Sequence, residues 1–171
     1  LLQSSAASDV YKRQLYNLNS NRYFVIPAAN QKLAEMIQST KGINEIPYKL
    51  SIDSAQDFLN LSSISIVTSG TASLEAAVLG SVPIICYKTN FINYAIISRM
   101  LRIKNFGLPN LLLGKKLFPE LLQNQFTKEN ILEAVRNTTT LKKEYEDIPD
   151  LLRELLRGIG NEQAAKEIIS L

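Results

Sequence analysis

Histidine and tryptophan are absent from this 171-residue chain, and Cys86 is its single cysteine. These absences exclude a Ser-His-Asp triad, a histidine general base, a histidine-ligated metal, an intrachain disulfide and a CxxC zinc or redox site. Cys86 lies in the apolar run 82–87, which favours an inert buried thiol over a nucleophile. We therefore expect neither a metal nor a cofactor.

A strong excess of one charge and long apolar runs are also missing. The 19 Lys and Arg residues exceed the 16 Asp and Glu residues by only three, and they are scattered among the acids, so the sequence predicts no nucleic-acid binding but allows an anionic partner. The longest apolar run, 76–87, is interrupted by Gly80, Ser81 and Pro83 and falls short of the roughly 20 residues of a spanning helix. The beginning of the sequence shows no signal-peptide pattern. A soluble or membrane-peripheral protein is expected.

Strand and helix patterns alternate from residue 15 onward, whereas residues 1–14 show neither period and are interpreted as a non-native leader. Strands are predicted at 22–26, 48–52, 63–68 and 82–87, and helices at 31–39, 55–61 and 71–79. Further helices are predicted at 92–103, 128–137, 142–146, 151–158 and 162–171, with a loop at 108–114. Strands that are apolar on both faces and alternate with helices indicate a doubly wound, Rossmann-like α/β domain over 15–171 with a parallel sheet.

The most informative segment is ISIVTSGTASLEAAVLG, residues 64–80, in which a buried strand leads through Ser69, Gly70 and Thr71 directly into a helix. Gly70 allows a ligand to approach the backbone, and the first amides of the helix point outward with the positive end of the helix dipole. Such a turn suits a diphosphate. Glu75, four residues after Thr71, lies on the same helix face and is placed to accept hydrogen bonds from ribose hydroxyls.

A purely structural interpretation of this segment stays open, because Ser and Thr often precede helices only as caps. The sequence contains neither GxxxxGK[ST] nor GxGxxG, which disfavours a P-loop ATPase and an NAD-binding Rossmann domain.

Several further motifs resemble the C-terminal half of bacterial lipid-A-disaccharide synthases, over about residues 15–171. The matching residues are Ser69-Gly70-Thr71-Ala72, Leu74-Glu75, Gly80, Pro83, Tyr87-Lys88, Tyr94, Leu108-Pro109-Asn110-Leu111-Leu112, Gly114, Pro119-Glu120-Leu121-Leu122-Gln123 and Glu162-Gln163-Ala164-Ala165. SGTAxLE occurs in several sugar-nucleotide enzymes, whereas LPNLL followed by PELLQ at this distance is more specific.

The resemblance implies an inverting glycosyltransferase of the two-domain GT-B class. The family joins UDP-diacylglucosamine to diacylglucosamine 1-phosphate (lipid X), which gives lipid A disaccharide and UDP. By the same resemblance, Ser69, Gly70 and Thr71 face the diphosphate and Glu75 faces the ribose. Tyr87, Lys88 and Asn110 match further substrate-binding positions, although Asn110 also fits a turn residue after Pro109, and Tyr87 and Lys88 a solvent-exposed strand end.

The basic segment 92–106 is the candidate membrane surface. Arg99, Arg102 and Lys104 stand beside apolar residues, an arrangement that suits either an anionic bilayer surface or a helix packed on the sheet with solvated charges. With the resemblance, this predicts a cytoplasmic protein, peripheral on the inner membrane of a Gram-negative bacterium. Whether it forms a homodimer stays open.

The family's N-terminal half and the Pro-Gly-Ser-Arg loop that opens its C-terminal half have no counterpart here. Because that half would supply the acceptor site and the catalytic acid or base, we expect this chain alone to bind nucleotide without turnover. Two alternatives remain. The first is another UDP-sugar GT-B enzyme, an epimerase or the peptidoglycan glucosaminyltransferase, and the second is a non-catalytic sugar-phosphate-binding module.

Overall fold

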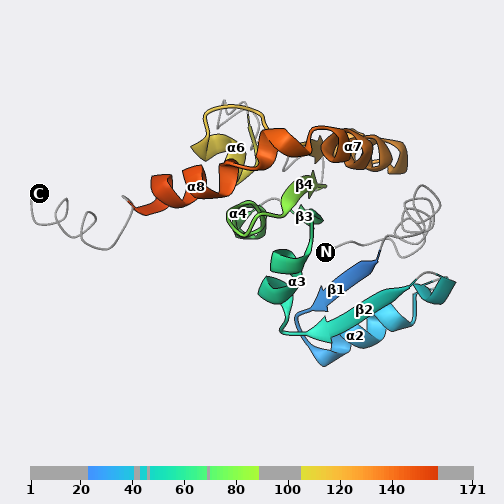
Figure 1. Ribbon diagram of the computed structural model, residues 1–171. Helices are drawn as coiled ribbons and strands as arrows, with labels where there is room; N and C mark the ends of the chain where they lie inside the picture. Colours follow the sequence, from blue (N-terminus) through green and yellow to red (C-terminus); the bar gives the residue numbers. More distant parts are fainter. Residues whose placement is uncertain (1–22, 41–42, 46, 69, 89–104, 158–171) are drawn as a thin grey trace, which may run out of the picture.

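The computed structural model describes residues 23–40, 43–45, 47–68, 70–88 and 105–157 (Figure 1). The strands are paired in parallel and helices pack against them, which confirms the predicted α/β class. The expected leader and the helices predicted at 92–103 and 162–171 lie outside the described residues.

The first sheet consists of two strands, β1 (Phe24–Ala28) and β2 (Tyr48–Ile52). Between them lie α2 (Gln31–Gln38) and a short 3-10 helix (Ile43–Glu45). The Oδ1 atom of Asn30 caps α2 by accepting a hydrogen bond of 2.9 Å from the Leu33 amide. β1 continues through Pro27 rather than ending before it. Proline is tolerated there because β1 is an edge strand, paired only with β2 among the described residues.

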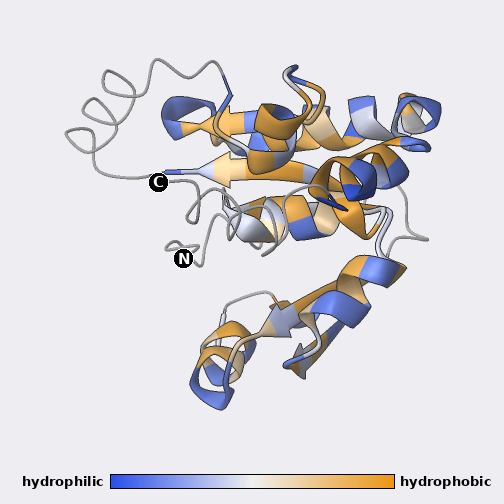
Figure 2. Cartoon of the chain, turned by 90° about the vertical axis from the view of Figure 1, so that its left-hand side faces the viewer, coloured by the Kyte–Doolittle hydropathy of each residue, from blue (hydrophilic) through white to orange (hydrophobic). Residues whose placement is uncertain are grey.

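The second sheet has the order β3-β4-β5 and carries the main core. Its strands are β3 (Ile64–Thr68), β4 (Val82–Tyr87) and the short β5 (Glu120–Leu122). α4 (Thr71–Val78) and α7 (Lys128–Thr140) both pack against the central strand β4, which is buried from Val82 to Cys86. Figure 2 shows the apolar residues gathered inside this body and the polar residues on its outer helix turns.

The sequence predicted a parallel sheet, and the described strands form two parallel sheets. β1 pairs with β2 and β3 pairs with β4, so no ladder joins β1 to β3. Instead, α3 (Ala55–Leu61) connects the two parts by contacting both β1 and α4 (Figure 1). Among the described residues, the outer edge of β3 therefore has no neighbouring strand, and Ile66 is 41% exposed.

The chain after β4 differs from the prediction in two short elements. Residues 108–112, predicted as loop, form the helix α6 (Leu108–Leu112), in which Pro109 occupies the first turn, where proline needs no amide hydrogen. The three-residue strand β5 was not predicted. Two short 3-10 helices, Gln123–Gln125 and Lys142–Tyr145, flank α7.

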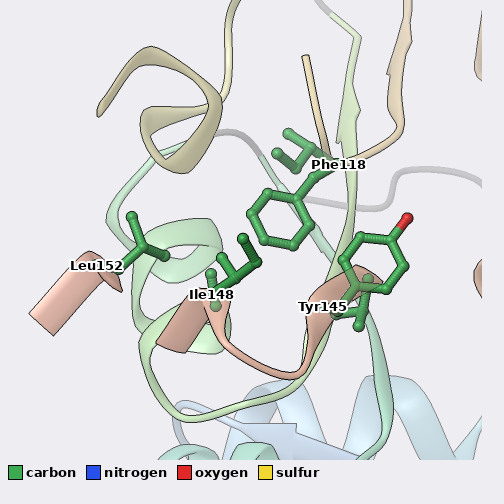
Figure 3. Packing of buried hydrophobic residues seen from close by; sticks show 7 residues of the cluster. Phe118, Tyr145, Ile148 and Leu152 are labelled. Atoms are coloured by element: carbon green, nitrogen blue, oxygen red, sulfur yellow. The ribbon is translucent and has the colours of Figure 1, made fainter. Parts of the chain in front are cut away.

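The helix α8 (Ile148–Arg157) closes the core on the α4 side. Phe118 and Tyr145 stack with ring centroids 5.7 Å apart, and Ile148 and Leu152 of α8 complete the same cluster (Figure 3). Arg153 of α8 also donates a hydrogen bond of 2.7 Å to the Val78 carbonyl, in the last turn of α4. Because the last carbonyls of a helix have no intrahelical partner, this contact caps α4 from a position 75 residues later in the chain.

Candidate functional site

The turn between β3 and α4 has the geometry that the sequence predicted. Gly70 is the N-cap of α4, with φ 136° and ψ −158°, a backbone conformation that side chains other than glycine's rarely adopt. A Cβ atom built at Gly70 would meet no atom within 4 Å, so the turn is open on that side. The Ser73 amide and hydroxyl both donate to the Gly70 carbonyl, at 3.2 and 2.7 Å, and hold the turn in place.

The parallel register brings a second set of predicted residues to the same edge of the sheet. Thr68, the last residue of β3, is paired with Cys86, so β3 and β4 end side by side. Tyr87 ends β4 half-buried, and the exposed Lys88 follows it. Thr71 is exposed and Glu75 half-buried on α4. Ser69 lies outside the described residues, so its predicted contact with the diphosphate stays a prediction.

This edge has the electrostatics of an anion site. The amide end of α4 contributes a partial positive charge, and the exposed Lys88 adds a full one. Ligands of doubly wound sheets bind at the carboxyl ends of the strands, which is where the Gly70 turn and Lys88 lie. The arrangement is compatible with the predicted diphosphate contact, which stays a prediction. Among the described residues, no cluster of three or more potential ligand side chains could hold a metal.

Asn110 lies on α6 and not in the turn between β3 and α4. Its side chain is completely buried, and its amide group is hydrogen-bonded inside the protein. The Oδ1 atom accepts from the Leu117 and Phe118 amides at 2.9 and 2.8 Å. The Nδ2 atom donates to the Phe118 carbonyl and to Glu120 Oε1, both at 2.9 Å. This arrangement favours a structural role, although Asn110 belongs to a helix and not to the turn that the sequence suggested.

Glu120 is the residue that sequence reasoning missed. Its carboxylate is 4% exposed and accepts hydrogen bonds from the Phe106 amide at 3.1 Å to each oxygen, from the Gly107 amide at 2.9 Å and from Asn110. A glutamate inside an apolar strand pattern was the available signal, because a buried carboxylate requires several donors around it. The two specific motifs of the resemblance, LPNLL and PELLQ, thus meet in one buried hydrogen-bond network.

Cys86 is buried, as expected, and burial raises the pKa of its thiol to about 12. Because the thiolate is the reactive form, Cys86 should not react with a thiol reagent at pH 8 in the folded protein. We expect labelling by a chromogenic disulfide reagent to proceed only at the rate of unfolding and to become fast in denaturant. Fast labelling of the native protein would contradict the buried position.

The candidate membrane surface cannot be placed, since Arg99, Arg102 and Lys104 lie outside the described residues. Within the part of the chain that the structure describes, no helix is both long and apolar enough to span a bilayer.

Comparisons with known proteins identify relatives along nearly the whole chain. A family described as lipid-A-disaccharide synthetase matches residues 8–168. The chain is 34% identical over 155 residues to the lipid-A-disaccharide synthase of Dechloromonas aromatica. The alignment covers 87% of this chain and 41% of the Dechloromonas protein. It is also 33% identical over 156 residues to the protein of the same name from Alcanivorax borkumensis. That alignment covers 86% of this chain and 40% of the Alcanivorax protein. The chain therefore spans well under half the length of these relatives.

Proposed function

Since this chain belongs to the lipid-A-disaccharide synthetase family, we propose that it is the donor-binding part of an inverting glycosyltransferase. The complete enzyme would transfer diacylglucosamine from UDP-diacylglucosamine to lipid X and release lipid A disaccharide and UDP. The observation that carries the proposal is the open turn at Gly70, where the amide end of α4 meets the carboxyl edge of a parallel sheet.

The proposed role of this site is to hold the leaving nucleotide. As the glycosidic bond to the diphosphate breaks, negative charge grows on the departing oxygen, and a preorganised positive end of a helix stabilises it. Gly70 and Thr71 would supply the backbone approach, and Lys88 a cation at the same edge. Glu75 would accept hydrogen bonds from the ribose. The general base for the acceptor hydroxyl is assigned to no residue of this chain.

Contact with the cytoplasmic surface of the inner membrane is also proposed, because both substrates of the reaction carry acyl chains. The basic segment with Arg99, Arg102 and Lys104 is the candidate for that contact.

Ligand choice tests the donor-site proposal against its two alternatives. UDP should raise the melting temperature of this chain, because a ligand that binds only the folded state stabilises it by mass action. UDP, UDP-N-acetylglucosamine and glucosamine 6-phosphate are titrated separately in a thermal shift assay. Stabilisation by the phosphosugar alone would favour the non-catalytic sugar-phosphate module. Stabilisation by UDP-N-acetylglucosamine far beyond UDP would favour an enzyme that recognises the unacylated sugar.

Glu75→Ala tests the ribose contact. Loss of charge-assisted hydrogen bonds to two hydroxyls should weaken UDP binding roughly tenfold or more, while the half-buried position leaves the fold intact. Calorimetric titration of UDP measures the change, and uridine and 2′,3′-dideoxyuridine diphosphate separate ribose contacts from phosphate contacts. Glu133→Ala, on the exposed side of α7, is the control. An affinity for UDP equal to that of the unaltered chain would remove Glu75 from the site.

A further inference from the structure

We propose that Asn110 and Glu120 form a positioning pair that sets the geometry of the donor site, and that Asn110 acts without touching the substrate. The inference rests on the proposed function and adds a second, buried layer to it. It is drawn from the network in which Asn110 Nδ2 donates to Glu120 Oε1 at 2.9 Å.

The pair holds α6 in place through two sets of hydrogen bonds. A helix of five residues is not stable by itself, and its N-cap, Gly107, has no side chain with which to cap it. Glu120 instead fixes the chain that enters the helix, by accepting the amide hydrogens of Phe106 and Gly107 from its place on β5. From the middle of α6, Asn110 binds the chain that returns to the sheet by accepting the amide hydrogens of Leu117 and Phe118.

Both elements that carry the candidate site are in contact with this assembly. α6 packs directly on α4, whose N-terminus forms the turn at Gly70. Gly107 lies against the Ile85 side chain of β4, two residues before Tyr87. A shift of α6 is therefore transmitted to the diphosphate turn through α4 and to the end of β4 through Ile85.

Direct contact of Asn110 with a substrate conflicts with its surroundings. The side chain is completely buried, and each of its two polar atoms already has two partners. A ligand could reach it only by breaking this network. The positioning role uses both side chains, since neither completes the network alone.

A double-mutant cycle on UDP affinity tests the proposal. Asn110→Ala, Glu120→Ala and the double variant are compared by calorimetric titration of UDP, well below their melting temperatures. Each single substitution should lower the affinity, by up to about 100-fold, because small displacements of positioning groups are costly. The double variant should bind no more weakly than the weaker single variant, because both residues act in one network. Additive losses, or a loss with Asn110→Ala and none with Glu120→Ala, would overturn the proposal in favour of direct contact.

Ile131→Ala separates positioning from general stability. Ile131 is buried on α7 against the other face of β4, away from α6, so this variant should melt at a lower temperature and still bind UDP normally. If the pair variants lose stability but bind UDP as tightly as Ile131→Ala does, the pair is merely structural and the proposal is wrong.

Glu120→Gln decides the matter if an alanine variant does not fold. It keeps an Oε1 acceptor and places an amide group against the Phe106 N–H, so it should fold and lose UDP affinity about threefold or more. Unchanged affinity would overturn the positioning role. If the unaltered chain does not bind UDP at all, the proposed function fails first, so the two failures are distinguishable.

Discussion

Leu152→Ala is expected to lower the free energy of unfolding by about 2–5 kcal/mol. Leu152 is completely buried between α8 and the core cluster that includes Ala77 and Phe118 (Figure 3). Truncation removes apolar contacts and leaves a cavity that a packed interior closes only partly. Urea unfolding followed by circular dichroism measures the loss, and each kcal/mol should lower the melting temperature by about 2–4 °C in a domain of this size.

Leu155→Ala is the matched control, because Leu155 lies on the same helix but is 40% exposed. Its truncation should cost well under half as much as that of Leu152, since less apolar surface is lost from contact. Equal losses at the two positions would mean that α8 does not pack through Leu152 as described.

Gly107→Ala is expected to destabilise the protein by about 1–3 kcal/mol through overpacking. The backbone of Gly107, with φ −81° and ψ 130°, suits any residue, so the cost is not conformational. A Cβ atom there would collide with Cδ1 of Ile85, a completely buried side chain that can shift only by repacking its neighbours. It would also lie 3.3 Å from Glu120 Oε1. Chemical denaturation of the variant gives the size of the loss.

Ile85→Val provides the rescue for this prediction. Valine lacks the Cδ1 atom that the new Cβ would meet, so the double variant Gly107→Ala/Ile85→Val should be more stable than the sum of the two single losses predicts. Strictly additive losses would show that the collision is not the cause.

The continuous part of the fold and the turn at Gly70 could be predicted from local patterns. β3, the turn at Gly70, α4 and β4 are consecutive in the sequence. The strands and the helix are each indicated by their residue pattern, and the turn is indicated by its glycine. The pairing of Thr68 with Cys86 then places Tyr87 and Lys88 beside the turn, which the parallel arrangement already implied. Local sequence suffices here because the site is built from neighbouring segments.

The buried network could not be predicted in the same way. Asn110 and Glu120 are joined by tertiary contacts between a five-residue helix and a three-residue strand, and elements this short have too few residues to show a period. Asn110 after Pro109 therefore suggested a turn, and Glu120 was noted only as part of the PELLQ motif, without a role. The division into two sheets was missed for a related reason, because strand patterns specify buried faces but not which edges pair.

The hydrogen bond from Arg153 to the Val78 carbonyl bears on where this polypeptide can be shortened. Removal of everything after residue 147 would take away the cap of α4 together with Ile148 and Leu152, and it would uncover Ala77 and Ile85 to water. Such a truncated product should aggregate during purification, whereas one that stops at residue 157 retains the cover. Limited proteolysis would accordingly be expected to leave α8 uncleaved.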